Sequence, residues 1–322
     1  MNFATKILCA ALALAGASMG AHAQGYPSQP IKIVVGYQAG GPTDLTARLI
    51  ADKMTRSMGQ PIIVENKVGA GSNIASEFVA AAKPDGYTLL LAAAPISWNP
   101  MLYKNVKYDV LRSFEPIANV MTAPQILAVS TKLPVKDLKD LVALAKRQPG
   151  KLTYGSSGAG GSPHLAGELL KQRAGIDIVH VPYKGASGAL NDLVAGHVDM
   201  SFMTSMSAIP HLASGNPKAL AVASEKRLPQ LPNVPTVAEM GYPGFEAESW
   251  NGLFAPAKTP PEIVSRLNAE VNKALQDPEV REKLTSQGAV VVGGTAQSFR
   301  SYLVKEVERW GGLMKTNKVT LD

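Results

Sequence analysis

The residues that could do chemistry in this chain are concentrated in glycine- and serine-rich loops. Each loop follows a short apolar strand and leads into a helical pattern. There are four such segments, Ile31–Leu45, Ile62–Ile74, Leu152–Leu165 and Ile178–Leu190. Where a strand passes through a loop into a helix, unpaired backbone N–H groups and the positive end of the helix dipole face one point. The chemistry that this arrangement favours is the binding of a small anion.

The candidate donors in these loops share two properties. Glycines permit a ligand to approach the backbone closely, and proline, serine, threonine, asparagine or aspartate can begin or cap the following helix. Ordinary turns with ordinary caps are the alternative interpretation of any single loop. The residues concerned are Gly40, Gly41, Pro42, Thr43 and Asp44 in the first loop, Gly69, Ala70, Gly71, Ser72 and Asn73 in the second, and Ser156, Ser157 and Gly158 in the third.

Catalytic and cofactor motifs do not accompany these loops. The one G-x-S-x-G sequence, Gly16–Gly20, lies in the apolar leader, and the later histidines show no spacing typical of metal ligands. Neither Gly69-Ala70-Gly71 nor Gly158–Gly161 completes a dinucleotide-binding G-x-G-x-x-G, and no phosphate-binding P-loop is present. We therefore predict no catalytic residues, no metal and no cofactor.

The first residues predict export. Lys6 precedes an apolar run over Ile7–Met19, and Ala21-His22-Ala23 forms an A-x-A cleavage site. We expect a signal peptide over residues 1–23, cleavage after Ala23 and a periplasmic mature protein. The single cysteine, Cys9, would leave with the leader, which excludes disulfides and thiol chemistry. The net charge of +7 is scattered along helical stretches, a pattern that does not indicate nucleic-acid binding.

Strands alternate with helices along the whole chain, which predicts α/β layers with mostly parallel sheets. A proline-rich stretch, Leu228–Gly244, is expected to be a long irregular loop. Two similar halves result, and a cleft between them is a common place for a ligand. Expected strands are Ile31–Tyr37, Ile62–Asn66, Thr88–Ala93, Gln125–Ser130, Leu152–Tyr154, Ile178–Val181, Val198–Met203, Leu220–Ala223 and Val290–Val292. Expected helices are Thr43–Met58, Asn73–Ala82, Lys136–Arg147, His164–Arg173, Ala189–Ala195, Pro260–Leu275, Pro278–Gln287 and Ala296–Lys315.

At these loops the chain resembles the Bug-type extracytoplasmic solute receptors, the substrate-binding components of tripartite tricarboxylate transporters. The resemblance covers nearly the whole mature chain, and the order and spacing of its motifs make it specific. The motifs are Gly40-Gly41 with Asp44 and Ala47-Arg48, Val64–Lys67 with Gly69-Ala70-Gly71, Lys83–Leu89, Tyr154-Gly155-Ser156, His164-Leu165, Val181–Gly185, Gly196–Asp199, and Val234-Pro235-Thr236 with Glu239 and Gly241.

The resemblance implies a two-lobed, Venus-flytrap periplasmic-binding-protein fold. Each lobe would be a central β-sheet flanked by helices, and the ligand would lie in the cleft between them. The first lobe would comprise residues 24–123 and a return segment, 248–322, and the second lobe residues 124–247. The chain would cross between lobes near Met121–Gln125 and Glu246–Asn251.

The resemblance also implies a small carboxylate ligand, held by backbone amides and ordered water. The ligand would be a di- or tricarboxylate or an aromatic carboxylate. The protein would be a monomer whose other partners are the membrane permease subunits of the transporter. The implied ligand-binding residues are Tyr37, Gln38, Gly40, Gly41, Pro42, Thr43, Asp44, Ala70, Gly71, Ser72, Ser156, Ser157, Gly158, His164, Tyr183 and Thr204.

One departure from the family pattern bears on the ligand. Tyr37, Gln38 and Ala39 stand where the family often has phenylalanine and proline, which adds a hydroxyl and an amide near the expected pocket. Two other functions stay open from the sequence. The chain could be a ligand-sensing subunit that docks to a signalling receptor, or a secreted enzyme with an unrecognised carboxylate site.

Overall fold

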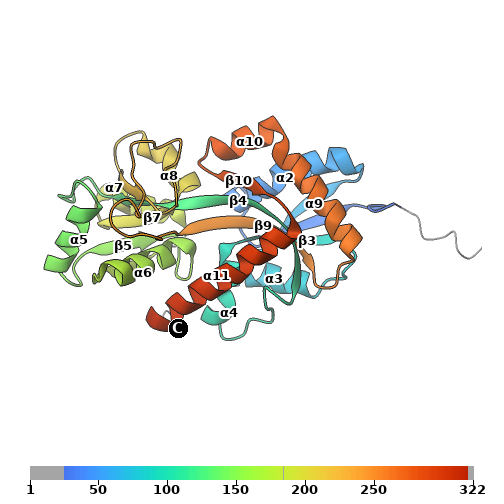
Figure 1. Cartoon of the computed structure of the whole chain (residues 1–322), viewed down its shortest axis with the longest axis horizontal. Coiled ribbons are helices and arrows are strands. Elements are labelled where there is room, and N and C mark those ends of the chain that lie inside the picture. Colours follow the sequence, from blue (N-terminus) through green and yellow to red (C-terminus); the bar gives the residue numbers. More distant parts are fainter. Residues whose placement is uncertain (1–24, 184, 318–322) are drawn as a thin grey trace, which may run out of the picture.

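The computed structural model describes residues 25–183 and 185–317. The expected signal peptide and its cleavage site, together with Lys184 of the fourth loop, lie outside the described residues. Within them the protein is an α/β structure with two lobes, which occupy the two halves of the view in Figure 1. Two strands, β4 and β9, extend between the lobes, and one helix, α11, runs beside them (Figure 1).

The first lobe is built on three parallel strands in the order β2-β1-β3. Their buried residues are mainly branched aliphatic, as expected for a parallel sheet covered by helices on both faces. Its elements before β4 are β1 (Ile31–Val35), α2 (Pro42–Met58), β2 (Ile62–Asn66), η1 (Ala70–Ser72), α3 (Asn73–Ala80), β3 (Thr88–Ala93), η2 (Ala94–Ser97) and α4 (Asn99–Leu102).

The second lobe repeats this plan with three parallel strands in the order β6-β5-β7. Helix α8 was not expected from the sequence because Pro210 lies inside it, although Thr204 caps its start. The elements of this lobe are α5 (Leu138–Arg147), β5 (Thr153–Ser156), α6 (Ser162–Ala174), β6 (Val179–Pro182), α7 (Ala186–Ala195), β7 (Met200–Thr204), α8 (Ser205–Leu212) and β8 (Lys218–Val222).

Strand β4 (Phe114–Val129) belongs to both lobes because its partners change along its length. Its first part, Phe114–Pro124, pairs with β9 (Glu248–Pro256), and its last five residues pair with β7 and β8. The sequence predicted the end of β4 alone and did not predict β9. Two prolines and two register shifts interrupt the β4 pattern, and burial on both faces removes the alternation that marks most strands. The change of partners after Pro124 supports the proposed crossings, which remain predictions.

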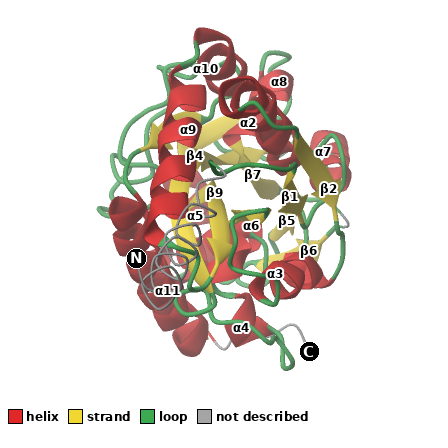
Figure 2. Cartoon of the chain, turned by 90° about the vertical axis from the view of Figure 1, so that its right-hand side faces the viewer, coloured by secondary structure: helices red, strands yellow, loops and turns green. Residues whose placement is uncertain are grey.

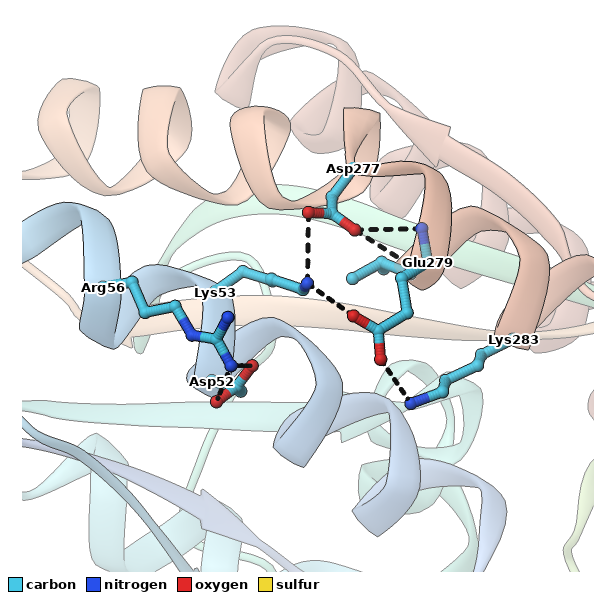
Figure 3. A network of polar contacts seen from close by, with 7 residues as sticks. Asp52, Lys53, Arg56, Asp277, Glu279 and Lys283 are labelled. Atoms are coloured by element: carbon cyan, nitrogen blue, oxygen red, sulfur yellow. Dashed lines mark hydrogen bonds and ion pairs between the residues drawn. The ribbon is translucent and has the colours of Figure 1, made fainter.

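The last quarter of the chain packs against the first lobe. It contains α9 (Pro261–Gln276), α10 (Pro278–Thr285), β10 (Val290–Gly293) and α11 (Ala296–Asn317). Lys53 on α2 forms ion pairs with Asp277 at 3.1 Å and with Glu279 at 2.7 Å, and Glu279 also pairs with Lys283 at 2.7 Å (Figure 3). Strand β10 adds to the first part of β4. The two ion pairs of Lys53 join residues that are more than 200 positions apart.

Helices cover both faces of the sheet in each lobe (Figure 2). The largest fully buried side chains include all three tryptophans of the chain, Trp98, Trp250 and Trp310. They share one apolar cluster with residues of both lobes, for example Leu90 of β3 and Leu165 of α6. The apolar core is therefore continuous between the lobes.

Candidate functional site

A cavity of about 590 Å³ lies between the lobes, where the strands of the two parallel sets end. All four strand–loop–helix joints that the sequence singles out contribute to its wall, and two further joints, after β3 and β7, do so as well. The wall is formed by Gly36, Tyr37, Gln38, Gly41, Pro42, Thr43, Val68, Gly69, Gly71, Ser72, Ala93, Pro95, Asn99, Tyr103, Met121, Ala123, Ser157, Gly158, Ala159, Gly160, Gly161, Ser162, Pro163, Gly185, Ala186, Thr204, Met206, Ser207, Ser249 and Asn251.

The loop between β1 and α2 is held from behind by a buried carboxylate. Asp44 accepts hydrogen bonds from the Gly40 N–H, from Arg48 Nε and from Asn66 Nδ2, each at 2.9 Å. Asn66 Nδ2 also donates to the Tyr37 carbonyl at 2.9 Å. Burial alone would raise the pKa of Asp44, but these hydrogen bonds outweigh it and hold the pKa below its ordinary value. Asp44 is therefore ionised and shapes the loop.

The loop between β5 and α6 is held by two stacked histidines. The Gly160 N–H donates to His164 Nδ1 at 3.0 Å, and Ser156 Oγ lies 2.7 Å from His180 Nε2. The two imidazole rings stack with their centroids 3.9 Å apart. Burial lowers the pKa of His164 and lowers that of His180 to about 3. Both side chains are therefore neutral at pH 7, and His164 Nδ1 is free to accept.

Residues of the joints after β1, β2 and β3 close the first-lobe side of the wall. Gly36 has no room for a side chain, since a Cβ there would lie 1.9 Å from Ser72 Oγ. Asn99 Nδ2 donates to the Gly71 carbonyl at 2.8 Å and so links these two loops. Burial raises the pKa of Tyr37, and the Ser72 side chain acts in the opposite direction with a smaller effect. The hydroxyl of Tyr37 therefore remains protonated at the cavity wall.

Ten of the sixteen predicted ligand-binding residues line the cavity, and six do not. Those that line it are Tyr37, Gln38, Gly41, Pro42, Thr43, Gly71, Ser72, Ser157, Gly158 and Thr204. Those that lie outside the wall are Gly40, Asp44, Ala70, Ser156, His164 and Tyr183. Asp44, Ser156 and His164 support the loops from behind, and the Tyr183 hydroxyl donates to Asp192 on α7 at 2.5 Å.

Two kinds of lining residue were not found from the sequence. The first kind follows β3 and β7, and includes Pro95, Asn99 and Ser207. The sequence did contain a signal for them. Two expected strands, Thr88–Ala93 and Val198–Met203, end shortly before these residues, so further strand–loop–helix joints could have been predicted there. The second kind consists of Met121 and Ala123 on β4, with Ser249 and Asn251 on β9. These crossing strands left no signal because nothing local distinguishes their residues from other core positions.

The cavity wall is uncharged. Among the described residues that line it there is no aspartate, glutamate, lysine, arginine or histidine. Its polar groups are backbone amides, hydroxyls and side-chain amides, and the first turns of α2 and α6 both face it. N–H groups in a first helical turn have no partner within their own helix, and the helix dipole adds partial positive charge there. This arrangement suits an anion that is bound without a cationic side chain.

In the part of the chain that the structure describes, no three His, Cys, Asp or Glu side chains gather as metal ligands. In the same residues no helix has the length and apolar character needed to cross a bilayer.

Comparisons with known proteins agree with this geometry. Residues 46–319 match the family model described as the tripartite tricarboxylate transporter family receptor. A protein encoded in the tcbD-tcbE intergenic region of Pseudomonas sp. strain P51 is 40% identical over 317 residues, which cover 97% of this chain and 94% of that protein. BugT of Bordetella pertussis is 37% identical over 306 residues, covering 94% of each chain.

Solved structures are similar over the same length. The Rpa4515 protein of R. palustris, determined with adipate, has a TM-score of 0.83 and 36% identity, with 92% of this chain and 100% of that one covered. MatC of Rhodopseudomonas palustris, determined with bound malate, has a TM-score of 0.78 and 35% identity, with 89% and 99% covered. The periplasmic binding protein BugD has a TM-score of 0.80 and 38% identity, with 91% and 99% covered. The chain therefore belongs to the receptors of the tripartite tricarboxylate transporter family, of the Bug type.

Proposed function

We propose that this protein binds a small carboxylate in the periplasm and delivers it to the membrane permease subunits of a tripartite tricarboxylate transporter. The observation that carries the proposal is the uncharged cavity between two glycine-rich loops, each of which begins a helix. A carboxylate can accept several backbone N–H bonds at such a place without a paired cation. The mature protein would begin after Ala23 and act as a monomer.

Binding would proceed by closure of the two lobes around the ligand. A ligand that contacts both loops binds the closed arrangement better than the open one, so it shifts the population toward closure. No bond is made or broken in this process. Ordered water can complete the hydrogen bonds of a ligand smaller than the cavity.

The ligand is a di- or tricarboxylate or an aromatic carboxylate. Related proteins hold adipate and malate, and the wall offers apolar surface from Met121, Met206 and Pro95. Tyr37 and Gln38 add a hydroxyl and an amide at the first loop. Those two groups favour a ligand with a polar substituent besides its carboxylate.

A thermal-shift panel tests the proposal. Purified mature protein is mixed with mono-, di- and tricarboxylates, aromatic acids, amines and sugars. Since a ligand that binds the folded state stabilises it by mass action, at least one carboxylate should raise the melting temperature. A shift with amines or sugars, and with no carboxylate, would contradict the ligand class.

A further inference from the structure

The three tryptophans of the chain form one connected group beside the cleft. The indole N–H groups of Trp250 and Trp310 both donate to Glu306 Oε2, at 3.0 and 3.1 Å. The ring of Trp98 packs on that of Trp310, with centroids 5.4 Å apart. Trp98 and Trp250 are completely buried, and Trp310 almost so. Glu306 and Trp310 lie on α11, which packs against β4 and η2.

The indole N–H of Trp98 has its partner in the other lobe. Trp98 follows β3 of the first lobe, and its Nε1 donates to the carbonyl of Gly160 in the loop after β5, at 2.8 Å. Gly160 lines the cavity, and its own N–H donates a hydrogen bond to His164 Nδ1. Both backbone groups of this glycine are therefore held, one from each lobe.

We propose that the hydrogen bond from Trp98 to Gly160 is a latch that holds the two lobes closed and so determines ligand affinity. This inference rests on the proposed function of the cavity as a binding site. Trp98 is not part of the cavity wall. It acts through the loop that the ligand contacts, and it is a positioning residue for binding.

The physical reason is that this bond differs between the two arrangements of the lobes. When the lobes separate, the indole N–H and the Gly160 carbonyl part and must find water. A contact present in one state alone shifts the equilibrium toward that state. A typical protein hydrogen bond of this kind shifts a population about fivefold to tenfold. Ser205 Oγ, at the start of α8, also donates to the carbonyl of Gly288, which lies between α10 and β10, at 2.7 Å, so a second hydrogen bond joins the two lobes.

The test compares two tryptophan-to-phenylalanine substitutions. W98F removes the N–H that crosses between the lobes. The matched control, W250F, removes an N–H whose acceptor, Glu306, lies in the same lobe. Small-angle X-ray scattering of the ligand-free proteins measures the radius of gyration, and calorimetry with adipate and with malate measures affinity. Should W98F not fold, W98M, whose side chain has neither an N–H nor an O–H donor, takes its place.

We expect W98F to have a larger radius of gyration than both the unsubstituted protein and W250F. Its Kd for whichever probe binds should rise about fivefold to tenfold, through faster dissociation. W250F should change the Kd less than about twofold. Equal scattering and equal Kd for W98F and W250F would overturn the latch. If neither probe binds the unsubstituted protein, the expected ligands are wrong, and the scattering comparison still decides on the latch.

Discussion

The loop that begins α2 and the loop that begins α6 have the same backbone but are held by different chemistry. The N-cap Gly41 has φ −78° and ψ 166°, and the N-cap Gly161 has φ −74° and ψ 163°. The preceding glycines, Gly40 and Gly160, have φ of +80° and +76°. In each loop the N–H of that preceding glycine donates to the side chain four residues later. That side chain is Asp44 in one lobe and His164 in the other.

The difference lies in the charge of the acceptor. Asp44 is an ionised carboxylate with Arg48 beside it, whereas His164 is a neutral imidazole stacked on His180. Both solutions leave the cavity wall uncharged, because each acceptor lies behind its loop. The comparison teaches that the backbone shape, and not a particular side chain, is the shared requirement of the two halves. Three tests separate the shared feature from the differing one.

Valine at the N-cap glycine of either loop tests the shared feature, with the largest expected effect. Both glycines have extended backbone that valine adopts readily, so G41V and G161V should fold. The side chain would block the approach of a carboxylate to the backbone N–H groups. We expect each substitution to weaken binding at least about 100-fold. The measurement is calorimetric titration with the carboxylate that shifts the melting temperature of the unsubstituted protein.

The control for this pair is G312V on α11, where open space surrounds the glycine. It should bind as the unsubstituted protein does. Unchanged affinity in G161V, with lost affinity in G41V, would mean that the ligand contacts one loop and not both. The equivalence of the two halves would then be limited to the fold.

Replacing the acceptor side chains tests the difference. D44N puts an amide N–H₂ among three donors and leaves Arg48 without its carboxylate, in a site where the Asp44 side chain is 1% exposed. We expect it to lower the free energy of unfolding by about 3 kcal/mol. H164N loses the ring stacking but keeps a hydrogen-bond acceptor, so we expect it to lower the free energy of unfolding by about 1 kcal/mol. Urea denaturation at pH 7 measures both.

D52N is the matched control for D44N. Asp52 pairs with Arg56 at the same i, i+4 spacing on the same helix, but both side chains are more than half exposed (Figure 3). D52N should lower the free energy of unfolding by less than about 0.5 kcal/mol. If D44N costs no more than D52N, the carboxylate is not what holds the first loop.

The comparison of the two loops also shows what could be predicted from sequence. The joints and the lobe plan were predictable, because glycine, proline and capping residues act locally. The side chains that hold the two loops in shape were not predictable. Asp44 and His164 were expected to contact the ligand, whereas in the structure each accepts a hydrogen bond from a glycine N–H of its own loop. A side chain at the third position of a helix can point forward to a ligand or back to its own loop. The contact between Trp98 and Gly160 joins residues that are 62 positions apart, which no local pattern records.

Acid pH should distinguish the two loops, with the smallest expected effect. A histidine whose folded pKa lies below its unfolded value of about 6.5 binds its proton more readily in the unfolded chain, so stability falls as the pH drops below about 6.5. The pKa of His180 is about 3, with burial as the main cause and with His164 and Lys171 adding to it. Glu168 acts in the opposite direction on His164. The pKa of Asp44 is lowered as well, but its contribution is lost only below the ordinary range of a carboxyl.

We therefore expect the loop that begins α6 to weaken first between pH 7 and pH 5. Allowing for the partial exposure of His180, its contribution to this loss is about 1 kcal/mol. Urea denaturation of the unsubstituted protein and of H180N at both pH values measures this contribution of His180, since the other titrating groups are common to the two proteins. The unsubstituted protein should lose about 1 kcal/mol more than H180N. Equal losses would mean that His180 titrates as it does in the unfolded chain, and the chemical difference between the two loops would then have no consequence for pH dependence.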